Sequence, residues 1–278
     1  MKLGQVLRPL VPAALRDKVP APAPAKAHAW PTRQHARKVL MLAGCVQPAM
    51  SPNINAATAR VLDAAGIQTL VAERAGCCGA IKSHLGDVDG GLADMRRNID
   101  AWGPLLDDGV EAIVMNASGC GVTVKDYGRA LAHDPTYADK AARISNLTRD
   151  LSEVLPALVP ALQVQLKGPR PRLAYHPPCT LQHGQQLRGG VEQIMRELGF
   201  EVTLAPIESH LCCGSAGTYS VLQPELSTAL RDRKLQALAP VSAEAIVSAN
   251  IGCIQHLQSG TSLPVKHWIE VLDETLHL

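Results

Sequence analysis

Short apolar runs alternate with stretches of helical spacing along most of the chain. The apolar runs typical of strands cover 38–43, 67–71, 112–115, 173–175, 201–204 and 245–248. The stretches with apolar residues at helical spacing cover 55–65, 91–106, 191–198 and 225–238. Strands that alternate with helices in this way are typical of βαβ units around a parallel sheet. The pattern therefore predicts an α/β fold.

The order of these elements occurs twice, and the cysteines occur twice in the same order. The first set is Cys45, Cys77, Cys78 and Cys120, and the second is Cys179, Cys212, Cys213 and Cys253. Equivalent cysteines are separated by 134, 135, 135 and 133 residues, so the spacing is almost constant. A repeat of this kind indicates a duplicated domain. We predict two tandem, duplicated Rossmann-like βαβ domains with parallel sheets, a first cysteine-rich domain at 37–166 and a second at 167–278.

The first 36 residues have a different character. The stretch 20–26 alternates proline with alanine, which is typical of an extended linker. We expect 1–36 to be a tether, with one short helix around 12–18. It lacks the continuous apolar core of a secretory signal, and no run of about 18 apolar residues that could form a transmembrane helix occurs in the sequence. These features favour a reducing, cytoplasmic compartment, and they are compatible with peripheral association at the inner membrane face.

Composition and charge exclude several functions. The net charge is only +2 and aromatic residues make up 3%, so neither a basic face nor a stacking platform for nucleic acid is expected. The sequence shows no nucleophile arrangement, P-loop or dinucleotide-binding glycine motif. We therefore expect no catalytic residue in this chain and place any substrate chemistry in other subunits.

The cysteines carry the candidate chemistry. Each follows a predicted strand, and the carboxyl ends of parallel strands meet at one edge of a sheet, so four thiols should converge at that edge in each domain. Soft thiolates suit iron–sulfur clusters or zinc, and the long spacings exclude zinc ribbons and short ferredoxin motifs. Adjacent cysteines can reach two atoms of a cluster, and Gly79 and Gly214 behind each pair allow close backbone approach. Iron–sulfur binding is favoured, with zinc and free buried or redox-active thiols as alternatives.

The repeated Cys…Cys-Cys-Gly…Cys pattern resembles the cysteine-rich CCG domain family, which includes the B subunit of heterodisulfide reductase. Over about 38–278 the chain looks like the iron–sulfur subunits of glycolate oxidase. The stretches that carry this resemblance are Tyr175-His-Pro-Pro-Cys179, Ser209-His-Leu-Cys-Cys-Gly-Ser-Ala-Gly217, Asn250-Ile-Gly-Cys-Ile-Gln-His256 and Pro264-Val-Lys-His-Trp-Ile269. The family's ferredoxin-like segment, with its two runs of four cysteines, is not present, so the chain resembles a truncated or split version.

The resemblance implies an electron-transfer subunit with [4Fe-4S]-type clusters in one or both repeats, or zinc in one of them. Its implied partners are FAD-containing glycolate oxidase subunits and a ferredoxin-like segment or subunit, with a quinone-like acceptor. Lactate-linked and glycerol-3-phosphate-linked relatives have similar patterns. A heterodisulfide-reductase-like thiol/disulfide catalyst and a zinc-binding assembly scaffold are the alternative functions.

The resemblance also bears on the ligand set. Family members that hold a non-cubane cluster with five thiolates end in Cys-x-x-Cys, whereas Thr123 and His256 stand at the fifth position here. The implied centre is therefore held by four cysteines in each repeat, or in the second repeat is completed by His256. For His176 and His210 we expect hydrogen-bonded structural roles, with donation to a cysteine sulfur as the alternative.

Overall fold

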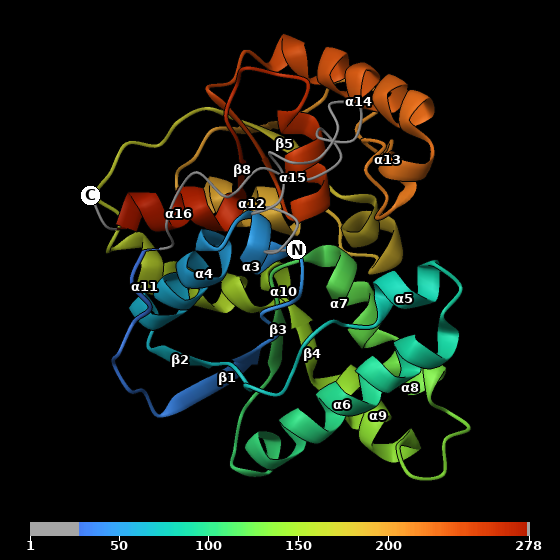
Figure 1. The fold of residues 1–278 in the computed structure, drawn as a ribbon. Coiled ribbons are helices and arrows are strands. Elements are labelled where there is room, and N and C mark those ends of the chain that lie inside the picture. The colour runs from blue at the N-terminus through green and yellow to red at the C-terminus, as the bar shows by residue number, and fades with distance from the viewer. Residues whose placement is uncertain (1–27, 277–278) are drawn as a thin grey trace, which may run out of the picture.

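Two four-stranded parallel sheets form the framework of the computed structural model, which describes residues 28–276 (Figure 1). The first sheet contains β1 (Arg37–Met41), β2 (Ile67–Leu70), β3 (Ile113–Met115) and β4 (Thr148–Asp150), in the order β2-β1-β3-β4. The second contains β5 (Leu173–His176), β6 (Val202–Leu204), β7 (Ala245–Ser248) and β8 (Val265–His267), in the order β6-β5-β7-β8. The strand order is the same in both, so the predicted pair of duplicated α/β domains is confirmed.

The helices repeat in a similar way. Those of the first half are α3 (Gln47–Met50), α4 (Asn53–Ala64), α5 (Ala80–His84), α6 (Val88–Asp107), α7 (Ser118–Lys125), α8 (Tyr127–Ala130), α9 (Ala138–Leu147), α10 (Leu151–Val154), η2 (Leu155–Leu158) and α11 (Val159–Gln163). Those of the second half are η3 (Thr180–Gly184), α12 (Gly190–Glu197), α13 (Tyr219–Leu222), α14 (Pro224–Leu238), η4 (Ala239–Val241), α15 (Ile251–Gln258) and α16 (Trp268–Leu276). Every predicted strand and helix of the two repeats has a counterpart here.

Local sequence explains where the long helices begin and which face they bury. The Asp87 side chain accepts a hydrogen bond from the Gly90 N–H at 2.9 Å and so caps the start of α6. Along α4, Ile54, Val61 and Leu62 recur at helical spacing, and all three are fully buried. The apolar pattern of the sequence is thus the pattern of burial.

One core belongs to the first domain alone, and a second core spans both domains. In the first, Trp102 of α6 stacks on Tyr127 with ring centroids 6.4 Å apart. The second joins residues of the first sheet and α4 to the whole interior of the second domain. The two domains therefore share a continuous apolar interior and are not independent units.

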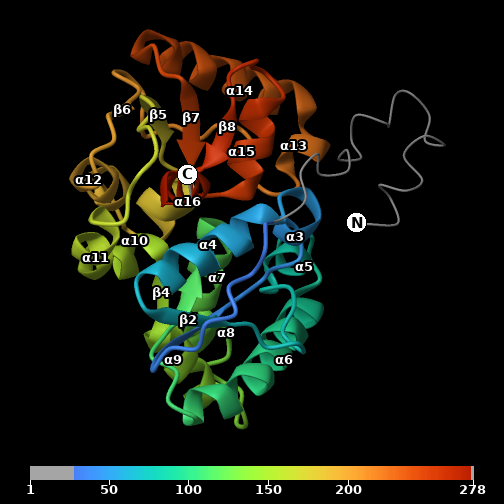
Figure 2. The ribbon, with the colours of Figure 1, turned by 90° about the vertical axis from the view of Figure 1, so that its left-hand side faces the viewer.

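An exchange of helices builds this shared interior. Helix α16 follows the fourth strand of the second domain and packs along α4 of the first (Figure 2). Its counterpart α10, with η2, follows the fourth strand of the first domain and packs on α12 of the second. Each domain thus covers the first long helix of the other. The carboxyl edges of both sheets are held in a fixed relation as a result.

A buried histidine also joins the two domains. The Nε2 of His267 lies 2.8 Å from the carbonyl oxygen of Asn116, to which it donates, and its Nδ1 accepts the Ile269 N–H at 3.2 Å. Burial lowers the pKa of His267 to about 3, so the ring stays neutral in the folded chain. The unfolded chain takes up a proton below the ordinary value of 6.5, so protonation favours unfolding as the pH falls through that value.

We expect the metal-free chain to be less stable at about pH 5 than at about pH 7.5, with about 2 kcal/mol of the loss coming from His267. The measurement is the free energy of unfolding in urea at both pH values, for the wild type and for His267→Gln. The substitution should remove that part of the pH dependence. An identical pH dependence in the two proteins would show that His267 does not cause it.

The described part of the expected tether, residues 28–36, lies along the first domain without helix or strand. Its Arg33 and His35 side chains both bond to the Asp63 carboxylate of α4, His35 at 2.7 Å. The short helix expected at 12–18 lies outside the described residues. Within residues 28–276, none of the helices has both the length and the apolar character needed to cross a membrane.

Candidate metal centres

The four cysteines of the first domain meet at the carboxyl edge of its sheet. Cys45 follows β1, Cys77 and Cys78 follow β2, and Cys120 follows β3. The Cys45 thiol interacts with Cys77, and Cys78 interacts with both Cys77 and Cys120. The predicted convergence of four thiols is therefore confirmed for this domain. Cys120 lies in the first turn of α7, where we had expected a loop.

The second domain gathers its cysteines in the same way. The Sγ atoms of Cys179 and Cys212 are 3.9 Å apart. Cys213 is fully buried and interacts with Cys212 and with Cys253, which lies in the first turn of α15. Two sulfurs 3.9 Å apart can bind one metal atom at the usual length of about 2.3 Å. The donor set thus fits a thiolate-bound metal centre.

The thiols do not share their charge evenly. In the second domain, hydrogen bonds from Cys179 and Cys213 and from the Gly214 N–H, which lies 3.3 Å from Sγ, lower the pKa of Cys212 to about 2. In the first, hydrogen bonds from Cys45 and Cys78 likewise lower the pKa of Cys77 to about 2. The pKa values of Cys78 and Cys213 are instead raised, by hydrogen bonds to neighbouring thiols and by burial. All four thiols of a group can be thiolates together only when a bound cation balances their charge.

The glycine behind each cysteine pair fits the loop against a helix. Gly79 has φ of +96° and Gly214 has φ of +89°, a region that other residues rarely adopt. A Cβ atom on Gly79 would lie 2.7 Å from the Gly91 carbonyl oxygen of α6, and one on Gly214 would lie 2.4 Å from the Ser227 carbonyl oxygen of α14. The close approach observed is therefore between loop and helix. Contact of these glycines with a cluster stays a prediction.

We expect Gly214→Ala to destabilise the metal-free chain by about 2 kcal/mol or more, because the new Cβ adds a backbone clash to a strained φ. Gly189→Ala is the matched control, since Gly189 has φ of +77° and nothing within 4 Å of its added Cβ. Urea unfolding of both variants measures the difference. Equal losses of stability in the two variants would mean that the close contact with α14 is not the reason why position 214 requires glycine.

Different residues brace the two cysteine pairs. In the first domain, the Asn98 Nδ2 donates to the Cys77 carbonyl oxygen at 2.8 Å, and the Tyr127 hydroxyl donates to the Cys78 carbonyl oxygen at 2.9 Å. In the second, the Ser227 hydroxyl donates to the Gly214 carbonyl oxygen at 2.8 Å. These bonds fix the direction of each loop and therefore of its thiols.

The candidate histidines occupy three different surroundings. The Nε2 of His256 lies 3.0 Å from the Ser227 Oγ and 3.1 Å from the Ser227 carbonyl oxygen, so this ring faces α14. His210 is exposed. His176 is buried beside the thiols: among the described residues, it forms a group of potential metal donors with Cys213 and Cys253 whose atoms lie within 4.8 Å of one another. The structure thus brings His176, rather than His256, to the second thiol group.

Segments next to the two thiol groups touch across the domain interface. The hydroxyl of Ser118, the first residue of α7 and two residues before Cys120, is 2.7 Å from the hydroxyl of Thr180, the first residue of η3 and the residue after Cys179. The Ser118 N–H also donates to the Ala249 carbonyl oxygen at 3.1 Å. Direct hydrogen bonds between these segments hold the two candidate centres next to each other.

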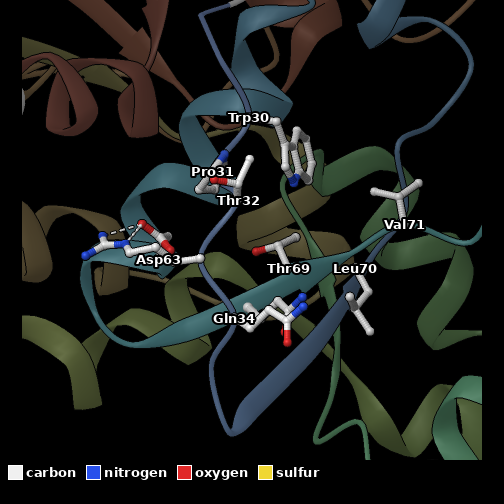
Figure 3. A pocket seen from close by; sticks show the side chains of 10 residues that line it. Trp30, Pro31, Thr32, Gln34, Asp63, Thr69, Leu70 and Val71 are labelled. Carbon is white, nitrogen blue, oxygen red and sulfur yellow. Dashed lines mark hydrogen bonds and ion pairs between the residues drawn. The ribbon is translucent and has the colours of Figure 1, made fainter.

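One pocket of the described chain lies away from the cysteines. It has a volume of about 570 Å³ and is formed between residues 30–34 and strand β2, next to Asp63 (Figure 3). No cysteine is among its lining residues in that part of the chain. It is therefore separate from the thiol groups.

Fold and thiols together define a class: a duplicated α/β protein in which each domain gathers four cysteines at the carboxyl edge of a parallel sheet, as thiolate-bound metal centres require. The sequence signature of the cysteine-rich domain, abbreviated CCG, matches residues 39–125 and 173–258, once in each domain. The chain belongs to the cysteine-rich domain family.

Three relatives show which proteins the chain is similar to. It is 50% identical to the glycolate oxidase iron-sulfur subunit of Escherichia coli over 99% of this chain and 67% of that protein. It is 29% identical to a probable glycolate oxidase iron-sulfur subunit of Bacillus subtilis, covering 81% of this chain and 50% of that protein. It is 26% identical to lactate utilization protein A of Bacillus licheniformis, covering 85% of this chain and 99% of that protein. The chain thus spans about two thirds of the first relative and half of the second.

Proposed function

We propose that this chain is an iron–sulfur electron-transfer subunit of a glycolate oxidase type complex. It would take electrons from an FAD-containing partner that oxidises glycolate to glyoxylate and pass them toward a quinone-like acceptor. The observation that carries the proposal is the pair of four-thiol groups whose flanking segments are hydrogen-bonded across the domain interface. The similarity to a glycolate oxidase iron-sulfur subunit supports this choice of complex.

The ligands proposed for the first centre are Cys45, Cys77, Cys78 and Cys120, and those for the second are Cys179, Cys212, Cys213 and Cys253. A bound [4Fe-4S]-type cluster supplies reversible one-electron storage. The chain's own residues hold the sulfurs in place. Cys78 and Cys213 are buried, which keeps water away from one side of each centre. Backbone N–H groups, such as that of Gly214, donate to the anionic thiolates. These are the means by which a protein tunes the potential of such a centre.

Electron transfer is expected to be the chain's only part in the reaction. Zinc in one of the two domains is compatible with the thiol ligands, and it would leave a single redox centre. A ferredoxin-like segment or subunit is the proposed neighbour in the electron path, and peripheral association with a membrane would bring the chain to a quinone. None of these roles requires a catalytic side chain here.

A direct test follows the oxidation state of the chain itself. The full chain, loaded anaerobically with iron and sulfide, is mixed with the FAD-containing subunits of a glycolate oxidase, and glycolate is added. The visible iron–sulfur absorption should bleach, and it should not do so when the flavoprotein is left out. Lactate and glycerol-3-phosphate, each with its own flavoprotein, test the related complexes. A flavin that is fully reduced by glycolate beside a chain that stays oxidised would contradict the proposal.

A further inference from the structure

His176 is a buried imidazole that no oxygen or nitrogen atom pairs. It is the last residue of β5 and is 1% exposed, and neither Nδ1 nor Nε2 has an oxygen or nitrogen partner. The ring instead interacts with the Cys253 thiol and helps to lower the pKa of that thiol. Buried polar groups are nearly always paired, and leaving one unpaired costs about 1–3 kcal/mol. An ordinary structural hydrogen bond is therefore not found for His176, and its interaction with Cys253 favours the alternative of donation to a cysteine sulfur. An imidazole in the interior whose neighbouring group is a thiol is placed to share a metal with that thiol.

The surroundings of His176 indicate what that partner is. One ring nitrogen and the Sγ atoms of Cys213 and Cys253 all lie within 4.8 Å of one another, and all three residues are buried. The Asn250 Nδ2 lies 3.8 Å from the Cys253 Sγ and donates to it, so this thiolate is already oriented from another side. Neutral imidazole nitrogen and thiolate sulfur are ligands for the same metals, iron and zinc among them. The ring is thus placed as a ligand would be.

The first domain has a different residue at this place. His176 stands three residues before Cys179, and Leu42 stands three residues before Cys45. Leu42 is buried, at 4% exposure, and its side chain cannot bind a metal. His256, the other histidine near the second centre, has its Nε2 engaged by Ser227. The repeats therefore differ in potential ligands at two places, Thr123 against His256 and Leu42 against His176, and only His176 lies with the thiols.

We infer that His176 is a nitrogen ligand of the metal centre in the second domain, so that the two centres of the chain are chemically unlike. The inference rests on the proposed function, because it requires that the second domain binds a metal centre. The first centre has thiolates alone, and the ligand set of the second includes a neutral imidazole. Where the imidazole takes the place of one of the four thiolates, the second centre has one anionic ligand fewer than the first, and this raises its potential. Electrons within the chain should therefore settle on the second domain.

The test uses the full chain, loaded anaerobically with iron and sulfide and labelled with ¹⁵N only in histidine. Pulsed EPR of the reduced protein should show a ¹⁵N coupling to one of its centres. This coupling should disappear in His176→Leu, which installs the residue of the first domain, and persist in the matched control His256→Gln. The midpoint potential of one centre should also fall in His176→Leu, or that centre should bind its metal at least about tenfold more weakly.

The free energy of unfolding of the metal-free chain separates a ligand role of His176 from a purely structural role. If His176 were purely structural, His176→Leu would be less stable than the wild type. Removing a buried imidazole that lacks an oxygen or nitrogen partner should leave metal-free His176→Leu at least as stable to urea as the wild type. Wild-type protein that contains iron but shows no histidine coupling would overturn the inference and leave the proposed function standing. A coupling unchanged in His176→Leu would also overturn it. A chain that binds neither iron nor zinc would instead contradict the proposed function.

Discussion

Cys213→Ser should empty the metal centre of the second domain and stop electron transfer through the chain. Cys213 is fully buried and interacts with Cys212 and Cys253, so bulk water does not reach the position of its sulfur. A serine hydroxyl is a harder and much weaker ligand for iron than a thiolate. Iron and sulfide per chain should fall by about half, and glycolate-dependent dye reduction by the assembled complex should be lost.

Cys78→Ser is the matched variant in the first domain, where Cys78 is 3% exposed and lies between Cys77 and Cys120. It should remove the other half of the iron and leave the EPR signal of the second centre in place. The flavoprotein should still be reduced by glycolate in both cases, because its own chemistry does not involve these thiols. Undiminished dye reduction in Cys213→Ser would refute the assignment of the second centre.

Breaking the ion pair between α4 and α16 should cost the largest amount of stability outside the centres. The Arg60 Nε lies 2.8 Å from the Asp273 Oδ1, and the two side chains are 11% and 5% exposed. Asp273→Ala leaves the Arg60 charge buried beside the exchanged helix, at a cost of about 3–5 kcal/mol. Urea unfolding of the metal-free chain measures this loss.

The double variant Arg60→Met/Asp273→Leu is the control for that experiment. It removes both charges and fills the space with apolar atoms, so much of the lost stability should return. Because α4 and α16 come from different domains, Asp273→Ala should also loosen the contact between Ser118 and Thr180 that joins the two loops. A single variant as stable as the wild type would mean that this pair does not hold the domains together.

The sequence contained most of the fold because each domain is built from local patterns. Apolar runs predicted the first three strands of each domain, and the repeated cysteine spacing predicted two similar domains. Strands β4 and β8 were missed because they are three residues long and carry polar or charged residues such as Arg149 and Lys266. The exchange of α10 and α16 between domains could not be foreseen, since only tertiary packing decides which sheet a terminal helix covers.

The candidate site was predictable in its sulfurs and less so in its histidines. Parallel topology alone brings the loops after successive strands to one edge, so the convergence of four thiols follows from their positions in sequence. Whether a histidine has a hydrogen-bond partner depends on neighbours that are remote in sequence. His256 proved to face Ser227, and His176 proved to face the Cys253 thiol with no oxygen or nitrogen partner. The one available signal was the contrast between Leu42 and His176 at the same place in the two repeats.

The central claim is that the two thiol groups hold iron–sulfur clusters. The most direct test is to measure iron, acid-labile sulfide and zinc per chain on anaerobically purified protein, together with a low-temperature EPR spectrum. We predict about four irons and four sulfides for each loaded domain, with EPR signals on reduction. Zinc without sulfide, even after reconstitution with iron and sulfide, would contradict the account and make the chain a zinc-binding scaffold.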